Sequence, residues 1–451
     1  MTKQRLIRNN YHGIVKAATW LLLLFAAALM TNSCTKDHNR EYVPVTEGEF
    51  KVIETVDLDM QDIVDDVMLL PDYPDLFDFH DFLYESRKLG DGFGPYIIRN
   101  QVVEYSSTDN HGNKIQLTGL MVHPISFKSK IYAPIVSFNH ATQILKKLAP
   151  SKWKTAKYKD YEDFPEAVLA NIMAATYGWI IVMPDYQGMG NDVGENHPFC
   201  IRERLAASTA DMVQVAINST SRFKNPYVIW NEKTFLYGYS EGGFVTMAAA
   251  RELEARNVKL NGVVCMSGPY DLTGTMLPVM LKDTAFPEPY FLPMVIVGYH
   301  EIYPQAFAYD IVLNEQYRTV LPQYTNGYYD AAVVNSKMPP DKILKKIFTA
   351  SFIDSLKNPA SQAMKIFALN NTHTGWTPKS KMYLWHCIND DCVPFGNFVT
   401  AKKHFQEIGL TNVDYKEYPA LPPKPEDGTI HARIAPRAFF EGSLWIFHNS
   451  K

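Results

Sequence analysis

The arrangement of apolar and polar positions predicts a chain that begins with strands and continues with alternating strands and helices. The stretch from Tyr96 to Pro124, YIIRNQVVEYSSTDNHGNKIQLTGLMVHP, predicts two strands around a turn at Asp109 to Asn113. Four later runs are mainly apolar and short enough to be buried strands: 133–141, 179–185, 234–240 and 260–268. The segments between them, FPEAVLANIMAATYG, RERLAASTADMVQVAI and GGFVTMAAARELEAR, have helical patterns. This alternation predicts an α/β fold in which a doubly wound, mostly parallel sheet carries helices on both faces.

The strand–helix rhythm stops near residue 270 and resumes near residue 380. The segment 271–379 is rich in Pro, Tyr and Met and is mostly helical or irregular in pattern. After it come a strand in KMYLWH, a helix near FVTAKKHFQEIG, a strand in VDYKEYP and a final helix in AFFEGSLWIFHN. We therefore expect one sheet built from 51–270 and 380–451, with 271–379 inserted as a helical cap or lid.

The first 50 residues have a different character. Basic residues precede the apolar run AATWLLLLFAAALM, which is shorter than the roughly 20 residues of a membrane span and is followed by small residues up to Cys34. Segment 1–34 resembles a bacterial lipoprotein signal peptide with Cys34 as the acylated residue, and ordinary secretory cleavage nearby is the alternative. The polar segment 35–50 predicts a tether. We expect an exported protein anchored to a membrane through lipid, either in the periplasm or on the outer membrane or cell surface.

Composition and charge exclude several classes of partner. The chain has 451 residues, of which 46% are apolar and 20% charged, with a formal net charge of -4, as expected for a globular protein with a large core. No basic stripe suggests nucleic acid as a partner. No Cys/His spacing is typical of a zinc site. Cys387 and Cys392 flank one loop and could pair, although four buried thiols, with Cys200 and Cys265, is the favoured interpretation.

The most informative motif is Gly238-Tyr239-Ser240-Glu241-Gly242, a G-x-S-x-G between a predicted strand and a predicted helix. In this context the motif predicts a nucleophile elbow, a tight turn that exposes the serine hydroxyl at a helix N-terminus. Glycines are needed on both sides because a Cβ there would collide with the neighbouring strand and helix. The alternative is a glycine-rich turn without chemistry.

A serine nucleophile needs a base, and the base needs an acid that orients it. On this fold both should follow the serine, the acid first. Asp390 lies on the loop after the strand MYLWH, with Asp391 as the neighbouring alternative, and His431 is expected between the last strand and the last helix. His373 and His386 precede the acid, and His404 and His448 suit packing or solvent-exposed roles better.

The oxyanion of an acyl-transfer intermediate requires backbone donors. The N–H of Glu241, directly after the serine, is the first candidate. The second should come from the loop after the first central strand, FNHATQI, where Ala141, Thr142 or Gln143 could present it. His140 is expected to shape this loop.

Together these residues resemble the α/β-hydrolase superfamily and, within it, the secretory lipase and esterase family of exported carboxylester hydrolases. The resemblance rests on the motifs that contain the following residues: Phe138 to Thr142, Met183 to Gly188, Gly238 to Gly242, His386 to Pro394, and His431 with Trp445. Ala141 and Cys387 stand where those enzymes have glycine. The resemblance implies a helical lid and the hydrolysis of esters with apolar acyl groups.

The expected function is serine carboxylester hydrolysis through Ser240, His431 and Asp390 and an acyl-enzyme, without metal or organic cofactor. The alternative is a serine peptidase of the same superfamily, which would use the same three residues. A binding lipoprotein with a dead site is a third class, and it would be expected only if a member of the triad were missing.

Overall fold

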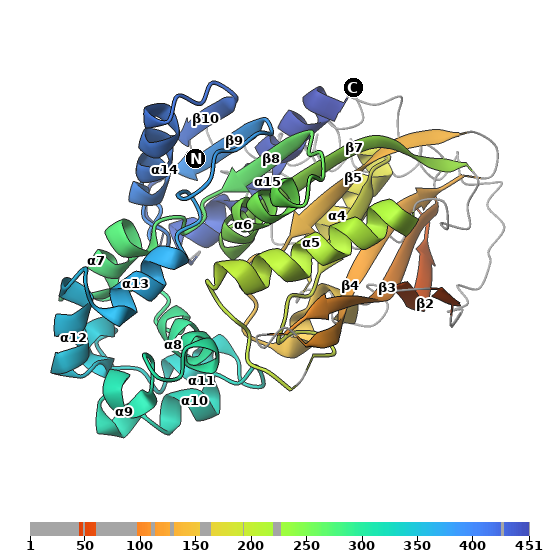
Figure 1. Cartoon of the computed structure of the whole chain (residues 1–451). Helices are drawn as coiled ribbons and strands as arrows, with labels where there is room; N and C mark the ends of the chain where they lie inside the picture. The colour runs from red at the N-terminus through yellow and green to blue at the C-terminus, as the bar shows by residue number, and fades with distance from the viewer. Residues whose placement is uncertain are drawn as a thin grey trace, which may run out of the picture. The chain divides into compact units, whose positions relative to one another are not determined.

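One sheet organises the part of the chain that the computed structural model describes, namely residues 45–47, 50–59, 97–109, 113–126, 130–153, 164–192, 194–219, 227–424 and 428–450. The predicted signal peptide, Cys34 and most of the predicted tether lie outside these residues. Within them ten strands are ordered β1-β2-β3-β4-β6-β5-β7-β8-β9-β10 (Figure 1). The strands are β1 (Val45–Glu47), β2 (Phe50–Leu58), β3 (Ile97–Thr108), β4 (Lys114–Ile125), β5 (Ile131–Asn139), β6 (Ile180–Pro184), β7 (Val228–Tyr239), β8 (Gly262–Met266), β9 (Met382–Cys387) and β10 (Val413–Tyr418).

The sheet has an antiparallel part and a parallel part. Strands β1 to β4 pair antiparallel with one another, and β4 pairs antiparallel with β6. From β6 to β10 every pair is parallel. Because parallel strands end at the same edge, the loops after β5, β6, β7, β9 and β10 meet there, which is where ligands bind in sheets of this kind.

Helices cover both faces of the sheet, as the alternation predicts. They are α4 (Pro165–Tyr177), α5 (Arg202–Ser219), α6 (Glu241–Ala255), α14 (Gly396–Glu407) and α15 (Ile430–Ser450). Apolar residues of α4 and α15 share one core cluster with the sheet, and those of α5, α6 and α14 share a second. Figure 1 shows α5 and α6 crossing the face of the sheet that is turned to the viewer.

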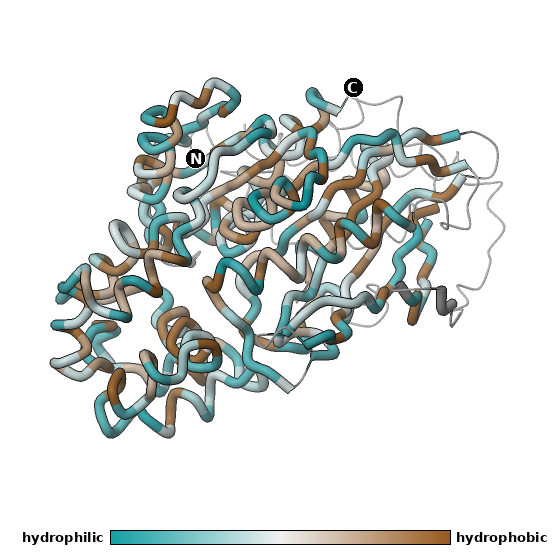
Figure 2. Tube along the Cα trace, in the orientation of Figure 1, coloured by the Kyte–Doolittle hydropathy of each residue, from teal (hydrophilic) through white to brown (hydrophobic). Residues whose placement is uncertain are grey.

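Strand β7 shows why the central strands are apolar throughout. Phe235, Tyr237 and Tyr239 point into the core cluster with α4 and α15, whereas Leu236 points into the other. All four side chains are buried. A strand covered on both faces cannot alternate between apolar and polar residues. Figure 2 shows brown, hydrophobic stretches along the strands in the middle of the molecule.

The segment between β8 and β9 is helical, as predicted. It contains short 3₁₀ or π turns, η6 (Leu272–Met276), η7 (Glu315–Tyr317) and η8 (Leu344–Ile347), and the helices α7 (Leu277–Met280), α8 (Phe291–Ile302), α9 (Tyr309–Val312), α10 (Val320–Tyr324), α11 (Ala331–Asn335), α12 (Ala350–Lys357) and α13 (Gln362–Leu369). Its apolar residues form a third core cluster, which also includes Tyr186, Phe199 and Phe244 from the sheet-bearing part. The inserted helices gather at the lower left of Figure 1.

Three local expectations need correction. The predicted tether 35–50 includes β1, whose backbone pairs with β2, so the chain joins the sheet from Val45. Strand β7 begins at Val228 rather than at 234 because its first residues pair with the start of β5. Helix α15 begins at Ile430 and runs through Pro436, well before the predicted final helix.

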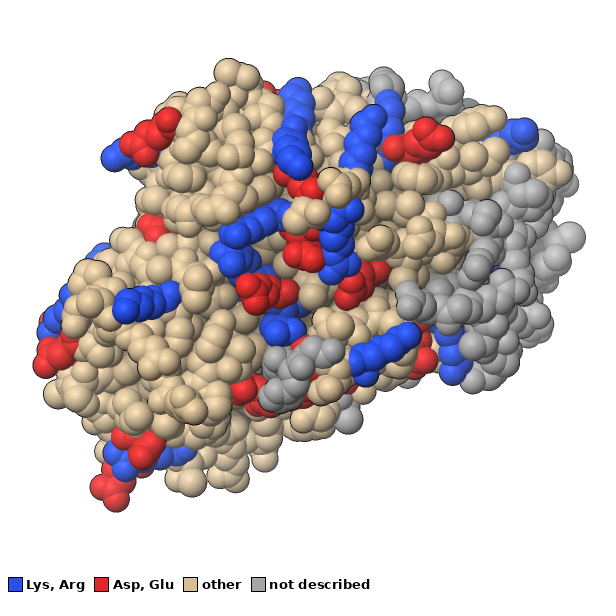
Figure 3. Space-filling view, in the orientation of Figure 1, with Lys and Arg blue, Asp and Glu red and all other residues tan. Residues whose placement is uncertain are grey.

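The remaining general expectations can be compared with the described residues. Their four cysteines, Cys200, Cys265, Cys387 and Cys392, are free and buried, in agreement with the favoured interpretation. None of the helices in the described ranges has the length and apolar character of a membrane span. On the face shown in Figure 3, residues of both charge signs are intermixed.

Candidate active site

The turn after β7 has the geometry of a nucleophile elbow. Ser240 has φ 60° and ψ −125°, a backbone conformation that L-residues rarely adopt, and it directly precedes the first residue of α6. Its N–H donates to the carbonyl oxygen of Met266 in β8 at 2.9 Å. The turn is therefore held to the next strand while the serine side chain is directed out of the sheet.

The glycines around the serine are required by close backbone contacts. A Cβ on Gly238 would lie 2.3 Å from the carbonyl oxygen of Gly242, and a Cβ on Gly242 would lie 2.0 Å from that of Asn139 at the end of β5. A Cβ on Gly243 would lie 2.4 Å from the carbonyl oxygen of Met266. The predicted clashes with strand and helix are thus present, and larger residues cannot occupy these positions without shifting the elbow.

Ser240, His431 and Asp390 form a continuous chain of hydrogen bonds. Ser240 Oγ lies 2.8 Å from Nε2 of His431, and Nδ1 of His431 lies 2.7 Å from Oδ2 of Asp390. All three residues are at least nine-tenths buried. The three residues that the sequence assigns to nucleophile, base and acid are therefore brought together at the carboxyl edge of the sheet.

The two neighbouring aspartates contact different parts of His431. Asp390 contacts the imidazole ring, and its Oδ1 accepts from the N–H groups of Cys392 and Val393. Asp391 instead accepts from the backbone N–H groups of Ile430 and His431 at 3.0 and 3.1 Å, which caps the start of α15. Asp390, rather than its neighbour, has the geometry of the acid.

The environment of Asp390 favours its charged form. Burial opposes ionisation, but the charge of His431 and its hydrogen bond outweigh burial and lower the pKa of Asp390. His386 lies close by, with Nε2 3.7 Å from Oδ2 of Asp390. Burial lowers the pKa of His386, which favours the neutral ring, and its Nε2–H donates to the carbonyl oxygen of Val393.

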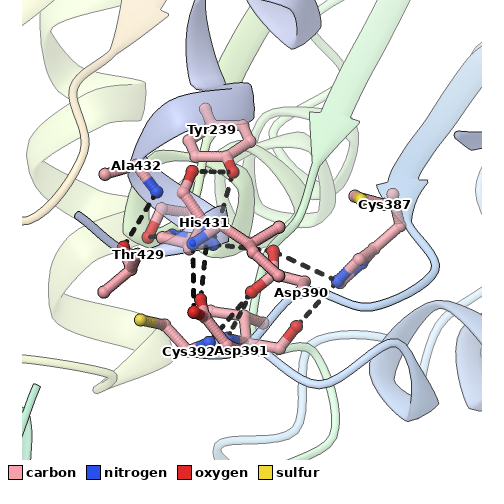
Figure 4. A network of polar contacts seen from close by, with 12 residues as sticks. Tyr239, Cys387, Asp390, Asp391, Cys392, Thr429, His431 and Ala432 are labelled. Atoms are coloured by element: carbon pink, nitrogen blue, oxygen red, sulfur yellow. Dashed lines mark hydrogen bonds and ion pairs between the residues drawn. The ribbon is translucent and has the colours of Figure 1, made fainter. Parts of the chain in front are cut away.

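His431 lies in the first turn of α15, which corrects the expectation that it precedes the last helix. The sequence gives no sign that the carboxylate of Asp391 extends this helix by capping it. The hydroxyl of Tyr239 donates to the carbonyl oxygen of His431 at 2.6 Å and lies 3.3 Å from its Nδ1. Figure 4 shows that Tyr239, Asp390 and Asp391 surround His431. The position of the imidazole is therefore fixed through its ring and its backbone.

The candidate oxyanion donors differ in their availability. Glu241 begins α6, so its N–H is one of the unpaired donors at a helix N-terminus. The N–H of Ala141 donates to Oε1 of Glu166 at 2.9 Å, and this donor is therefore engaged. Thr142 lines the same pocket as Ser240 and Glu241. Of Ala141 and Thr142, Thr142 is the one that lines this pocket.

The loop after β5 is anchored by buried polar groups that the sequence does not reveal. His140 stacks on Tyr186 at a ring separation of 4.1 Å, and the Tyr186 hydroxyl donates to the carbonyl oxygen of His140. Glu166, in the first turn of α4, holds the next residue, Ala141. Burial is the main reason that the pKa of Glu166 is raised from the usual 4.5 to about 8. His140 thus shapes the loop, as expected.

Replacing Glu166 with Gln should make the protein relatively more stable at alkaline pH. The raised pKa means that the folded state binds this proton more tightly, so the stability it contributes is complete below pH 4.5 and is lost as pH rises to about 8. Glutamine keeps the acceptor for Ala141 and does not titrate. Urea denaturation measures the free energy of unfolding of both proteins. The difference between them should shift in favour of Glu166→Gln by about 1.4 kcal/mol per pH unit across this range. A difference in the free energy of unfolding that does not change with pH would contradict the raised pKa of Glu166.

An apolar pocket opens beside Ser240. The empty space within it, including space that is open to solvent, is about 580 Å³. It is lined by Thr142, Phe199, Cys200, Ser240, Glu241, Pro269, Leu272, Met276, Leu277, Met280, Phe286, Phe291, Val295, Tyr299, Phe367, Cys392 and Val393. Most of these residues belong to the inserted segment. The arrangement places a hydrogen-bonded serine at one end of a cavity suited to an apolar chain.

The other histidines considered from sequence do not join this chain of hydrogen bonds. His373 Nδ1 contacts the carbonyl oxygen of Tyr270, and His404 lies on α14. His448 lies near the end of α15, which also carries Trp445; that indole contacts Asp414 rather than the pocket. Within the described ranges, no group of three or more His, Cys, Asp or Glu residues has the arrangement of a metal site.

A second buried pair beside the serine could not be predicted from the sequence. His197 Nε2 lies 2.6 Å from Oε1 of Glu241. The two residues are 44 positions apart, and nothing in their spacing signals the contact. The contacts of Asp391, Tyr239 and Glu166 likewise cannot be predicted from the sequence. For one of these residues, Tyr239, its place next to Ser240 in the motif indicates that it lies near the site.

Comparisons with known proteins identify the family and the fold. The model of the family described as secretory lipase matches residues 166–420, a range that includes Ser240 and Asp390. The secreted triacylglycerol lipase LIP5 of Malassezia furfur is 22% identical over 252 residues, which cover 54% of this chain and 60% of that protein. The chain thus spans less than two thirds of the length of this curated relative.

Several solved structures share the fold. A Legionella pneumophila protein described as a hydrolase superimposes with a TM-score of 0.72 at 22% identity, covering 89% of this chain and 98% of that one. The rice cell wall degrading esterase LipA of Xanthomonas oryzae gives a TM-score of 0.65 at 22% identity, covering 78% and 89%. Candida antarctica lipase A gives 0.55 at 17%, covering 75% and 74%. At these identities the likeness establishes the fold, that of the α/β-hydrolases. Since the family model matches more than half of the sequence, this chain belongs to the secretory lipase family.

Proposed function

We propose that the protein is a serine carboxylester hydrolase that acts through Ser240, His431 and Asp390. The observation that carries the proposal is the hydrogen-bonded chain from Ser240 Oγ through the His431 ring to Asp390, located at the end of an apolar pocket. Membership of the secretory lipase family supports it. So does the similarity to the Malassezia furfur relative, a secreted triacylglycerol lipase.

The chemistry follows from the positions of the three side chains. Ser240 Oγ attacks the ester carbonyl while Nε2 of His431 takes its proton. The ionised Asp390, on Nδ1, keeps the ring in the required tautomer and stabilises the imidazolium. His431 then protonates the leaving alcohol, and a water molecule repeats the sequence on the acyl-enzyme.

The oxyanion is stabilised by the N–H groups of Glu241 and Thr142. Glu241 lies at the positive end of the α6 dipole, directly after the nucleophile. Thr142 comes from the loop after β5 and lines the same pocket as Ser240. Loss of one such donor costs about 10²- to 10³-fold in turnover.

The inserted segment 271–379 acts as a cap that holds the acyl group. Residues of η6, α7, α8 and α13, which all lie in this segment, contribute most of the apolar lining of the pocket. An apolar acyl chain gains from burial in such a cavity, whereas the one carboxylate that the lining offers a charged peptide amine, that of Glu241, is already paired with His197. The substrates are therefore esters with apolar acyl groups.

A panel of chromogenic esters with increasing acyl length, beside Pro- and Ala-anilides, tests the proposed function. Esters should be cleaved, with kcat/KM rising with acyl length until the pocket is filled, and the anilides should be cleaved much more slowly. Anilide cleavage without ester cleavage would overturn the proposal in favour of a peptidase.

The N-terminal segment directs export and attaches the protein to a membrane through Cys34. Support comes from the basic, apolar and small-residue order of segment 1–34 and from the secreted nature of the Malassezia furfur relative. Metabolic labelling with a fatty acid should mark the wild type and not Cys34→Ala. Equal labelling of both proteins would exclude this anchor.

A further inference from the structure

A buried ion pair lies directly behind the proposed oxyanion hole. The side chain of Glu241 is 0% exposed and that of His197 is 9% exposed, and Nε2 of His197 lies 2.6 Å from Oε1 of Glu241. Oε2 of Glu241 has no hydrogen-bond partner among the described residues. This carboxylate therefore depends on one imidazole for its hydrogen bonding, although its own backbone N–H is a proposed oxyanion donor.

The hydrogen bonds of His197 define its protonation. Nδ1 lies 3.1 Å from the carbonyl oxygen of Gln187, which can only accept, so Nδ1 carries a proton. Nε2 lies 2.6 Å from Oε1 of Glu241 and donates to this carboxylate when it carries a proton. Burial works against the charged ring, but the charge and hydrogen bond of Glu241 outweigh it and raise the pKa of His197. Together the two contacts favour the imidazolium form of His197 beside the Glu241 carboxylate.

The surrounding residues hold the ring in place. It stacks on Tyr186 at a ring separation of 6.0 Å. The backbone of His197 packs against α8, where a Cβ on Gly298 would lie 2.9 Å from the His197 carbonyl oxygen. The other charged or titratable groups that face His197 are His140, after β5, and Lys146, in η1 (Lys146–Leu148). Lys146 disfavours the charged ring, and Glu241 is the group that favours it.

We propose that protonated His197 is a positioning residue that neutralises Glu241 and thereby allows negative charge to develop in the oxyanion hole. The inference rests on the proposed function. A buried carboxylate attached to the residue that donates the oxyanion N–H would repel the oxyanion, because charges interact strongly at short range in a poorly solvated site. The imidazolium cancels that repulsion, and its bond also fixes the first turn of α6.

Charge-changing variants test this role on a soluble ester. Glutamine at position 197 can still donate to Glu241 but carries no charge. His197→Gln should lower kcat by about 10- to 100-fold while KM changes by less than about twofold. Adding Glu241→Gln removes the uncompensated carboxylate, so the double variant should be about tenfold more active than His197→Gln. A role limited to packing predicts instead that the double variant is no better than the single one.

The pH profile provides a second readout. Wild-type kcat should fall as pH rises through the pKa of His197, and this alkaline fall should be absent from the double variant. His123→Gln, the same exchange at a buried histidine of β4 that does not line the pocket, should retain wild-type kcat. Thermal unfolding of each variant identifies loss of folding.

The outcomes separate this inference from the proposed function. Wild-type kcat in His197→Gln, or a double variant no more active than His197→Gln, would overturn the role of His197 while wild-type ester cleavage leaves the proposed function intact. Absence of ester cleavage in the folded wild type would instead overturn the proposed function.

Discussion

Ser240→Ala should lower kcat for ester cleavage by about 10⁵- to 10⁶-fold, because it removes the only atom that can form the acyl-enzyme in the proposed mechanism. The residual rate would come from the oxyanion donors and substrate binding alone. The fold should survive, since the serine side chain contacts His431 and the pocket rather than packing into the apolar core. Steady-state kinetics with a chromogenic ester and a thermal unfolding curve measure both quantities.

Ser208→Ala is a matched control for this prediction. Ser208 is buried like Ser240, but its hydroxyl bonds to backbone oxygens of its own helix α5, and it does not line the pocket. The activity of Ser208→Ala should equal that of the wild type. Substantial activity in Ser240→Ala would contradict the assignment of Ser240 as the nucleophile, whatever the activity of Ser208→Ala.

Asp390→Asn should lower kcat by about 10⁴-fold with little change in KM. The amide preserves the size of the side chain, but it does not stabilise the imidazolium and it favours the wrong tautomer of His431. The low pKa of Asp390 implies that the carboxylate is ionised at neutral pH, so the variant removes a full charge. Kinetics at neutral pH measure the effect.

Asp391→Asn distinguishes the two neighbouring carboxylates. Asp391 accepts from two N–H groups at the start of α15 and does not contact the imidazole. Its replacement weakens a helix cap worth about 1 kcal/mol and should reduce kcat by at most about tenfold. An equal loss in the Asp390 and Asp391 variants would contradict the assignment of the acid.

Much of the fold could be predicted because the central strands are buried on both faces and the helices between them are long. Phe235 to Tyr239 form an apolar run for this reason, and the glycines around Ser240 record the close backbone contacts of the elbow. The order of acid and base along the chain follows from the fold, which is why Asp390 and His431 could be named from sequence.

The unpredicted contacts involve residues that are distant in sequence and have no common motif. His197 contacts Glu241 because the connections after β6 and β7 meet at the edge of the sheet, and Glu166 contacts Ala141 because α4 begins beside the loop after β5. The start of α15 was placed too late because Asp391, about forty residues earlier, supplies its cap. Such contacts depend on tertiary structure, which hydrophobic periodicity does not encode.

Reaction with a fluorophosphonate, followed by peptide mapping, tests the central claim most directly. The reagent bonds covalently to an activated serine. The account predicts one phosphonyl group per chain on Ser240, with ester hydrolysis lost in the same proportion, and much slower labelling in His431→Ala. A phosphonyl group on another residue, or hydrolysis that persists after Ser240 is fully modified, would contradict it.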